Sequence, residues 1–404
     1  MKAESEPRSR RRIGTKTRIA AGVAAITLTV SGYSYEHPDK ASDTSRALFG
    51  ARATAQIEHI VQSVEDKYKQ LKYSVDHKIP KPLEHLHQNP VAYNSEPTSE
   101  NTQDFPPETI IDIQPPSPEP PKPAPLVLPE TKHLIPNETH GEGVWSFDGV
   151  PHNTPNDIMM AWTTFHPDSK RPYATAGVLL MDKRRIKLNI VAGTEEPGGG
   201  RGPGTIPNQD RANLLVAWNG GFKFINGGYG MYADGKFYRP LSNGLATIVT
   251  KRDGSIEIGQ WGQDLLWSAD IVAARQNAIP LIHHGEISSR TNDNSNWGYD
   301  LTSSSITWRS GIGVTMNGDI LLVAGNDLSA ATLAQSMWAA GAVEAMQLDI
   351  NRTFVTISMF FPRADGRGLR GESFINADGD INRFLSTNSR DFMYVTLEES
   401  KFKP

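Results

Sequence analysis

The sequence contains no cysteine among its 404 residues, which excludes a disulfide framework, a thiol nucleophile and any zinc site built on thiolates. It also lacks a strong charge of either sign, since its formal net charge is −4 and its pI is near 6.3. Lys and Arg are scattered among acidic residues in the C-terminal part and form no basic patch. Nucleic acid is therefore not an expected partner.

Tryptophan is missing from the first 140 residues, whereas more than half of the 28 prolines fall between positions 80 and 136. The apolar and aromatic side chains needed for a core are thus concentrated in the last two thirds of the chain. That length is sufficient for one large domain. We expect a single folded domain over residues 140–404.

The N-terminus, residues 1–40, combines a basic cluster, "RSRRRIGTKTR", with the apolar run "IAAGVAAITLTVSGYSY" at positions 19–35. The run is a little shorter than the roughly 20 residues that span a bilayer, and its basic flank is typical of the cytoplasmic side. No clean small-x-small cleavage site follows. We expect a membrane anchor or uncleaved signal that holds the protein on the extracytoplasmic face; a cleaved signal and a secreted protein are the alternative.

Two further segments precede the expected domain. Residues 41–76 contain an amphipathic helix at about 52–75, which could self-associate or stand alone as a stalk. Residues 77–139 are polar and rich in proline, which predicts a disordered, semi-rigid linker or a proline-motif ligand. The apolar stripe of the helix consists of Ile57, Ile60, Val61, Val64, Tyr68 and Leu71.

The domain itself has the pattern of short alternating strands with tight turns. The pairs Asp234–Gly235, Asp253–Gly254 and Asn317–Gly318 predict hairpins, the last of them as a type I′ turn. One helix is predicted in "DLSAATLAQSMWAAG", with Asp327 or Ser329 as N-cap and Gly341 as the stop. The predicted fold class is α+β, a strand-rich and largely antiparallel sheet domain with few helices.

After this helix, "GAVEAMQLDINRTF" predicts an apolar strand that ends in polar residues. In a regular strand Met346, Leu348 and Ile350 share one face, and Gln347, Asp349 and Asn351 share the other. An aspartate at a strand end can serve as acid, base or nucleophile, or can simply form an Asx turn. Asp349 is thus a candidate catalytic residue.

The stretch "LLVAWNGGFKFINGGYG" predicts a buried strand that ends at Asn219. Gly220 and Gly221 would let the backbone approach a ligand closely and point N–H groups at an anion, and Lys223 would add positive charge. An ordinary turn is the alternative.

In "TWRSGIGV", Arg309 shares a strand face with Gly311 and Gly313, so its guanidinium would lie over bare backbone and suit a phosphate or carboxylate. The alternative is an edge-strand arginine in a surface ion pair.

The glycine-rich stretch "GTEEPGGGRGPGTIP" carries Glu195 and Glu196 and lacks the Lys-Ser/Thr ending of a P-loop, so a lid is a better interpretation than a nucleotide site. The histidines show no metal-ligand spacing, and His283–His284 reads as an exposed pair. We expect no cofactor and no metal.

The order of "WNGGFKF", "NGLATIVTKRDGSIEIG", "WRSGIGVTMNGDILLVAG", an alanine-rich helix and "GAVEAMQLDIN" resembles the phosphodiester glycosidase family, in a divergent bacterial branch, over about residues 141–397. The resemblance implies a hydrolase that cleaves the glycosidic bond of a sugar phosphodiester in a cell-envelope or exported glycan. It assigns Asp349 to the anomeric centre and phosphate binding to Arg309 and Asn219, with the remaining contacts from Gly220, Gly221, Lys223, Asn351 and a second carboxylate, Glu195 or Glu196.

Two positions depart from the family pattern. Many relatives continue after Leu-Asp with small glycine and serine residues, whereas Ile350, Asn351 and Arg352 follow here, and Lys223 replaces the second aromatic of the usual loop. These departures support an alternative function, a non-catalytic envelope protein that uses the same fold to bind an anionic glycan polymer.

Overall fold

The computed structural model describes residues 66–88, 125–135, 141–154, 157–298, 306–350, 354–363, 367–375 and 380–398. All of these belong to one compact unit, Val61–Pro404. The expected membrane segment at 19–35 lies outside these ranges. Among the residues described, none of the helices combines the length and apolar character needed to cross a membrane.

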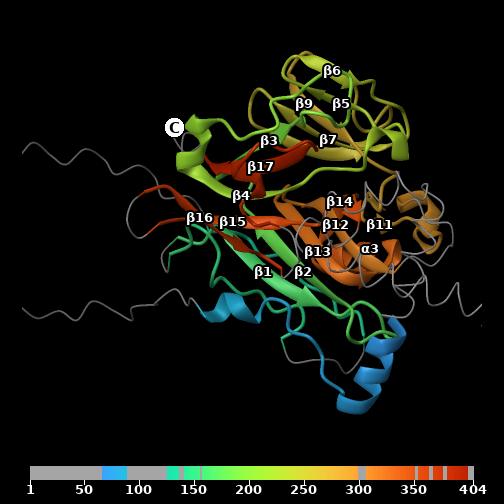
Figure 1. Ribbon diagram of the computed structural model, residues 1–404. Coiled ribbons are helices and arrows are strands. Elements are labelled where there is room, and N and C mark those ends of the chain that lie inside the picture. Colours follow the sequence, from blue (N-terminus) through green and yellow to red (C-terminus); the bar gives the residue numbers. More distant parts are fainter. Residues whose placement is uncertain are drawn as a thin grey trace, which may run out of the picture. The chain divides into compact units, whose positions relative to one another are not determined.

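Three antiparallel sheets form the domain (Figure 1). The first sheet has the order β1 (Met160–Phe165), β2 (Thr175–Met181), β13 (Ile320–Leu328), β12 (Thr307–Thr315), β14 (Ala342–Ile350), β10 (Ile282–His283) and β11 (Glu286–Ile287). The second has the order β16 (Leu369–Ser373), β15 (Ile357–Pro362), β4 (Leu214–Asn219), β17 (Phe392–Leu397) and β3 (Ile186–Val191). The third has the order β6 (Lys236–Arg239), β5 (Met231–Ala233), β9 (Ile271–Gln276), β7 (Ala246–Lys251) and β8 (Ile256–Gln260).

Helices are few in the described chain, which confirms the predicted strand-rich α+β class. The α-helix α3 spans Ala330–Ala339. The short 3-10 helices are η1 (Glu84–Gln88), η2 (Asn208–Asn213), η3 (Phe224–Asn226), η4 (Ser289–Asn292), η5 (Asn294–Trp297) and η6 (Arg383–Leu385).

Both faces of the first sheet are covered, so its central strands are buried along their whole length. On one face Leu179 packs in a core shared with the second and third sheets, which contribute Trp218 and Ile248. On the other face Val178 packs with Leu333 of α3. Burial on both faces explains why β2 reads as a continuous apolar run without alternation.

The helix α3 begins and ends where the sequence predicts. The Ser329 side chain accepts a hydrogen bond from the Thr332 N–H, and the Thr332 hydroxyl accepts one from the Ser329 N–H, which forms a capping box. Gly341 follows the helix at φ +94°, a conformation that favours glycine. Of the two predicted N-caps, Ser329 is therefore the correct one.

The predicted hairpins form, but only one has the two-residue turn. Asp234 and Gly235 both have positive φ, 53° and 73°, as a type I′ turn requires. The prediction of a type I′ turn at Asn317–Gly318 is wrong, because only Gly318 has positive φ and three residues separate the paired Thr315 and Asp319. This is the three-residue hairpin loop with glycine in the left-handed position.

The boundaries predicted for the proline-rich linker require correction. Residues 77–88 and 125–135 are described and lie against the domain, where Leu83 and Leu86 are each 1% exposed. Leu128 packs against the α3 side of the first sheet, and the Trp145 indole donates to the Pro129 carbonyl at 3.0 Å. Apolar side chains spaced between the prolines thus anchor these parts of the segment. Residues 89–124 and 136–140 lie outside the described ranges.

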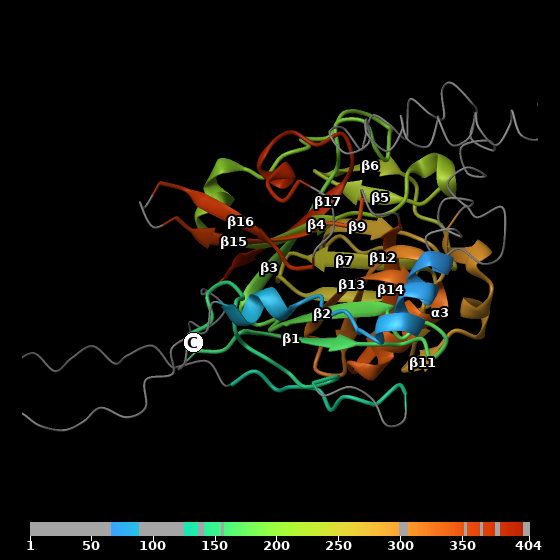
Figure 2. The same cartoon turned by 60° about the horizontal axis from the view of Figure 1, so that its bottom comes forward.

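Residues 66–76 form a helix that lies beside the domain (Figure 2). It contacts the domain through charged groups. Arg171 donates from Nε and Nη2 to the Asp66 carboxylate, at 3.0 and 3.2 Å. Lys69 pairs with Asp327, near the end of β13, at 2.9 Å. The helix is therefore held by its polar face.

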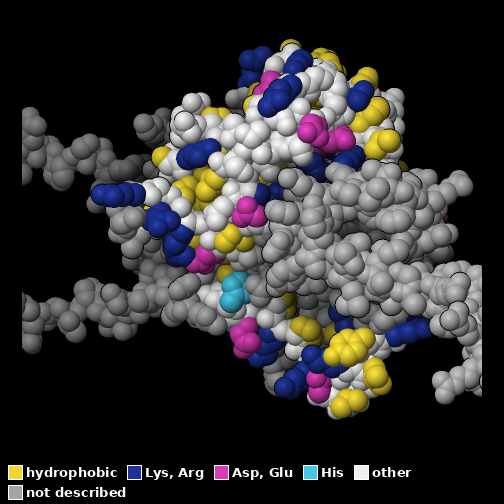
Figure 3. All heavy atoms as spheres, viewed as in Figure 1, with side chains coloured by type: hydrophobic (Ala, Val, Ile, Leu, Met, Phe, Trp, Pro, Cys, Tyr) yellow, Lys and Arg dark blue, Asp and Glu magenta, His cyan; other side chains and the backbone are white. Residues whose placement is uncertain are grey.

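The apolar face of this helix points outward. Tyr68 and Leu71 are each 64% exposed and Val75 is 76% exposed, and hydrophobic side chains gather over this helix on the molecular surface (Figure 3). Ile57, Ile60, Val61 and Val64 lie outside the described residues. Self-association through this stripe stays a prediction.

Candidate active site

The side chain of Asn219 joins three segments at the end of β4. Its Nδ2 donates to the Ser310 hydroxyl of β12 at 3.0 Å, and its Oδ1 accepts from the Thr356 N–H at 3.1 Å. Nδ2 also donates to the Gly220 carbonyl at 3.0 Å. Asn219 is 5% exposed. With these bonds the amide fixes the loop that follows β4 against the first sheet.

The N–H groups of the two glycines after Asn219 are directed at an acidic residue of the protein. Gly220 donates to the backbone carbonyl of Asp391 at 3.1 Å, and Gly221 donates to its carboxylate at 3.2 Å. A Cβ on Gly220 would lie 1.9 Å from the Asp391 carboxylate, so glycine is required for this close approach. The predicted anion-binding loop is present, but Asp391 occupies the position predicted for a ligand.

Asp391 is itself neutralised by Arg275 of β9. The guanidinium donates to both carboxylate oxygens, at 2.8 and 3.1 Å, and the two side chains are 0% and 1% exposed. Arg275 also donates to the Phe222 carbonyl at 2.7 Å, next to the glycine pair. A buried ion pair persists only when its remaining hydrogen-bonding groups are satisfied, and here the loop satisfies them.

Asp349 contacts the same serine hydroxyl as Asn219. Its N–H donates to the Ser310 hydroxyl at 3.2 Å, the same hydroxyl that accepts from Asn219. Its Oδ2 pairs with Arg390 at 2.6 Å, and its Oδ1 accepts from the Ile350 N–H at 2.8 Å. The structure thus brings Asn219 and Asp349 together through Ser310.

Arg390 connects the Asp349 carboxylate to the glycine loop. It donates to the Gly221 carbonyl at 3.1 Å, and its guanidinium lies 4.4 Å from the centre of the Phe354 ring. The side chains of Asp349 and Arg390 are 6% and 12% exposed. A cation with these contacts can hold either the carboxylate or a bound anion.

Burial raises the pKa of the Asp349 carboxyl above its ordinary value. The neighbouring Asp391 carboxylate adds to the rise, whereas Arg390 and the Ile350 N–H oppose it. A carboxyl group in this environment binds a proton more readily than an exposed aspartate, which suits a group that accepts a proton during a reaction.

A bulge in β14 aims Asp349 toward this cluster and corrects the face assignment made from the sequence. Arg309 of β12 pairs with Ile350 of β14, and Gly311 pairs with Gln347. The single residue between them on β12 therefore lies opposite two residues on β14, which defines the bulge. As a result Gln347 bonds Arg309 on one face, while Asp349 contacts Ser310 on the other. Gln347 and Asp349 do not share a face, nor do Leu348 and Ile350, which pack in different cores.

The structure does not bring the Arg309 guanidinium to the Asp349 carboxylate. Arg309 is 0% exposed and donates to the Leu328 and Trp297 carbonyls at 3.0 and 2.8 Å. It points to the face opposite its neighbour Ser310. The expected role in binding phosphate therefore stays a prediction without a geometric link to Asp349.

The face that Arg309 shares with Gly311 and Gly313 is covered by α3. A Cβ on Gly311 would lie 2.9 Å from the Met337 sulfur, and one on Gly313 would lie 3.1 Å from the Met337 methyl. The glycines allow the helix to pack closely on β12, so the expectation of bare backbone open to a ligand is wrong.

The other predicted binding residues lie around the glycine loop. The Phe224 N–H donates to the Glu196 carboxylate at 3.3 Å, whereas Glu195 has an exposed side chain and its N–H donates to the Ser389 carbonyl. Lys223 is partly exposed and immediately precedes η3. Asn351 lies outside the described residues.

Sequence reasoning missed Ser310, Arg390, Asp391 and Arg275. The run "NSRDF" carried a usable signal, since it places an arginine and an aspartate directly before an apolar strand. The sequence around Arg275 gives a weaker signal, because a lone arginine near the end of a strand does not reveal its partner.

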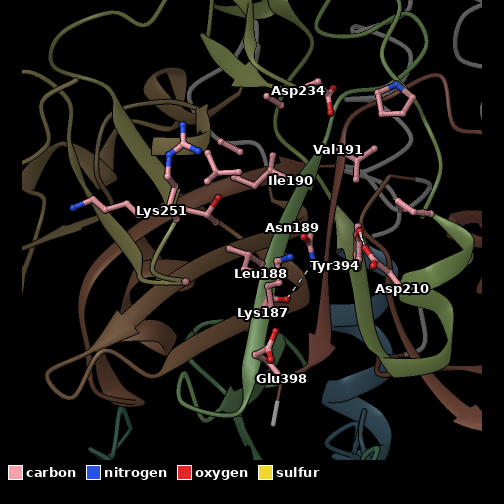
Figure 4. Close-up of a pocket in the computed structure, with 18 of the residues that line it drawn as sticks. Lys187, Leu188, Asn189, Ile190, Val191, Asp210, Asp234, Lys251, Tyr394 and Glu398 are labelled. Atoms are coloured by element: carbon pink, nitrogen blue, oxygen red, sulfur yellow. Dashed lines mark hydrogen bonds between the residues drawn. The ribbon is translucent and has the colours of Figure 1, made fainter. Parts of the chain in front are cut away.

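A cavity of about 790 Å³ lies elsewhere, between β3 and β9 of the second and third sheets (Figure 4). Its lining combines Lys187 and Lys251 with Asp210 and Asp234. Tyr394 donates to the Asp210 carboxylate, and burial together with this bond raises the pKa of the Tyr394 hydroxyl. The cavity is not lined by Asn219, Asp349 or Arg390, so it is separate from the cluster described above.

Residues 212–349 match the family model of phosphodiester glycosidases. The match begins two residues before β4 and ends at Asp349, so it contains Asn219, Ser310 and Asp349. Arg390 and Asp391 lie beyond it. No curated protein matches the chain.

Among the solved structures that are similar to the chain, three have sequence identities of 13% to 16%. The zebrafish N-acetylglucosamine-1-phosphodiester alpha-N-acetylglucosaminidase catalytic domain, auto-inhibited by its pro-peptide, has 16% identity and a TM-score of 0.40, with 66% of this chain and 98% of that chain covered. A hypothetical protein from Synechocystis has 14% identity, a TM-score of 0.34 and coverages of 59% and 62%. A putative exported protein from Burkholderia pseudomallei has 13% identity, a TM-score of 0.26 and coverages of 55% and 74%.

Proposed function

We propose that the protein is a hydrolase that cleaves the bond between the anomeric carbon and oxygen of a sugar phosphodiester in a cell-envelope or exported glycan, and that its N-terminal segment holds it on the extracytoplasmic face of a membrane. The observation that carries the proposal is the shared contact of Asn219 and Asp349 with Ser310, within the segment that matches the family.

The chemistry needs a carboxylate near the anomeric carbon and a counter-ion for the leaving phosphate. In this proposal the oxygen of a water molecule forms a bond to the anomeric carbon, and Asp349 accepts the proton of that water. The bond between the anomeric carbon and the phosphate oxygen breaks, and its electron pair leaves with the phosphomonoester. A phosphate is a good leaving group, so a strong general acid is not required.

Arg390 fits the anion-binding role that the sequence assigned to Arg309. It already contacts the Asp349 carboxylate and the Gly221 carbonyl, and its side chain keeps 12% of its surface exposed. A substrate phosphate could compete with Asp349 for the same guanidinium. Binding of substrate would then release the Asp349 carboxylate from Arg390, so that it could accept the proton of water.

The test uses the purified full-length chain with a panel of sugar 1-phosphodiesters and wall-polymer fragments. Release of reducing sugar is expected from at least one of them. Asp349→Asn should lower kcat by about 10²–10⁴-fold with little change in Kd, because an amide cannot accept the proton. Asp270→Asn, at an exposed aspartate, is the matched control and should retain activity.

A second candidate function is binding of an anionic glycan polymer without turnover. It is favoured by the fact that both Asp349 oxygens already have partners, the Arg390 guanidinium and the Ile350 N–H. Saturable binding of a wall-polymer fragment by the folded protein, with no sugar released across the panel and no effect of Asp349→Asn, would support this function and count against the hydrolase.

A further inference from the structure

Two consecutive histidines form the turn of the hairpin between β10 and β11. His283 pairs with Glu286, which leaves His284 and Gly285 as a two-residue turn with φ of 52° and 82°. These are the positive angles of a type I′ turn, which histidine tolerates better than most residues. In this turn the two imidazoles stack on the same side, with their centres 3.9 Å apart.

The third member of the cluster comes from a distant loop. Asp264 follows β8 in the third sheet, and its Oδ2 accepts from the Gln260 N–H at 2.7 Å, which fixes the carboxylate. His283 Nε2 lies 2.8 Å from Oδ2, and His284 Nε2 lies 3.4 Å from Oδ1. The donor atoms of the three side chains all lie within 4.8 Å of one another.

Glu344 of β14 completes the surroundings of His284. Its Oε1 lies 3.0 Å from His284 Nδ1 and accepts the His284 N–H at 2.7 Å. A proton on Nδ1 would be donated to this carboxylate, which leaves the Nε2 lone pair directed at Asp264. A carboxylate behind a histidine is the arrangement that orients metal-binding imidazoles in many proteins.

The geometry points to a binding site for a divalent first-row transition-metal ion, formed by Asp264, His283 and His284 with Glu344 as the orienting carboxylate. Ligands of a tetrahedral zinc ion lie roughly 3.3 Å apart at bond lengths of about 2.0–2.1 Å. The two histidine nitrogens lie 2.8 and 3.4 Å from the Asp264 oxygens, so small side-chain movements would bring the ligand atoms to this spacing. Imidazole nitrogens and a carboxylate oxygen suit zinc, and three protein ligands leave one position for water.

The site is distinct from the candidate active site. Glu344 and Asp349 are five residues apart on β14, or roughly 17 Å along an extended strand. Asp264 lies in the loop after β8 of the third sheet and the histidines lie in the β10–β11 hairpin of the first, so a bound ion would link the two sheets at this edge. Its expected contribution is to stability. The sequence interpretation as a plain exposed pair overlooked Asp264, which is 19 residues before His283.

Tag-free full-length protein, stripped of metal and titrated with ZnCl₂ at pH 7.5, tests the proposal. We expect one ion per chain with a Kd in the micromolar range or below, and a higher unfolding temperature with zinc. Asp264→Asn and His284→Ala should weaken binding by at least 100-fold, and Glu344→Gln by about 10–100-fold. Binding should weaken at pH 5.5, because protonated imidazole is not a ligand.

His133→Ala, at an exposed histidine outside the cluster, is the control and should bind zinc like the unmodified protein. Circular dichroism of each variant verifies that it is folded. Absence of zinc binding by the unmodified protein would overturn the proposal. Equal binding by the unmodified protein and by a folded Asp264→Asn/His284→Ala double variant would also overturn it, because the ion would then lie elsewhere.

Discussion

At the scale of single residues, the candidate site is a set of compensated charges. Arg390 and Asp391 are adjacent in the chain but serve different partners, since Arg390 pairs with Asp349 and Asp391 pairs with Arg275. Both acids are buried, so neither can lose its arginine without leaving a charge in an environment of low polarity. The two adjacent residues before β17 therefore hold both Asp349 and the glycine loop in place.

Replacement of Arg390 by glutamine should lower the free energy of unfolding by about 3–5 kcal/mol at pH 7.5, because it leaves Asp349 buried and unpaired. Burial already raises the pKa of Asp349, and loss of the cation raises it further. An acid whose folded pKa exceeds its unfolded value destabilises the fold as pH rises through that window. The loss should therefore be smaller at pH 5 in urea unfolding measurements.

The double variant Arg390→Gln/Asp349→Asn provides the control for this prediction. With a neutral amide in place of the carboxylate, most of the lost stability should return and the pH dependence of the difference should disappear. If the single and double variants were equally unstable at both pH values, the Asp349 charge would not be the cause.

At the scale of secondary structure, the sequence was informative where the signal is local. The boundaries of α3 follow from Ser329 and Gly341, and the hairpins follow from their Asp-Gly and Asn-Gly pairs. The bulge in β14 was not predictable, because it depends on how β12 pairs with it. For the same reason the sequence located Asp349 but assigned it to the wrong face with Gln347.

In the candidate site, too, the sequence predicted local features correctly and missed those that depend on strand pairing. Asn219 and Asp349 stand at strand ends that the sequence marks clearly, and both contact Ser310. Arg309 was equally prominent, yet its guanidinium bonds the carbonyls of Trp297 and Leu328 on the opposite face. Which side of a strand reaches a site is decided by long-range pairing, which a single sequence does not reveal.

The segment predicted as a linker yields a test at this scale. Leu86→Ala should lower the free energy of unfolding by about 2–5 kcal/mol, since Leu86 is 1% exposed and packs in the core of the three sheets. Urea unfolding of the full-length chain measures this change.

Leu71→Ala is the matched control, because the same substitution at a side chain 64% exposed should change stability by no more than about 0.5 kcal/mol. Equal, small effects at both positions would mean that the segment around Leu86 does not pack on the domain.

At the scale of the whole molecule, the chain combines a strand-rich domain, part of which is similar to phosphodiester glycosidases, with a long N-terminal region. The parts of that region that pack on the domain carry spaced leucines, and the basic and apolar segments of residues 1–40 precede them. For an enzyme whose substrate is an envelope polymer, attachment to the membrane would keep the domain near its substrate. This arrangement rests on the proposed location and can be tested apart from the chemistry.

The double variant Ile26→Arg/Leu28→Arg should release the full-length protein from the membrane fraction of a bacterial host after an alkaline wash. Each arginine costs about 2.5–3.5 kcal/mol at the centre of an inserted helix. Ile26→Val/Leu28→Val changes the same positions, keeps them apolar and should stay in the membrane fraction.

Protease added to spheroplasts should digest the domain of the unmodified protein only if it faces outward. Recovery of a shortened, soluble protein outside the cells would instead indicate a cleaved signal, and recovery of the intact unmodified chain in the cytoplasm would contradict both the anchor and the extracytoplasmic location.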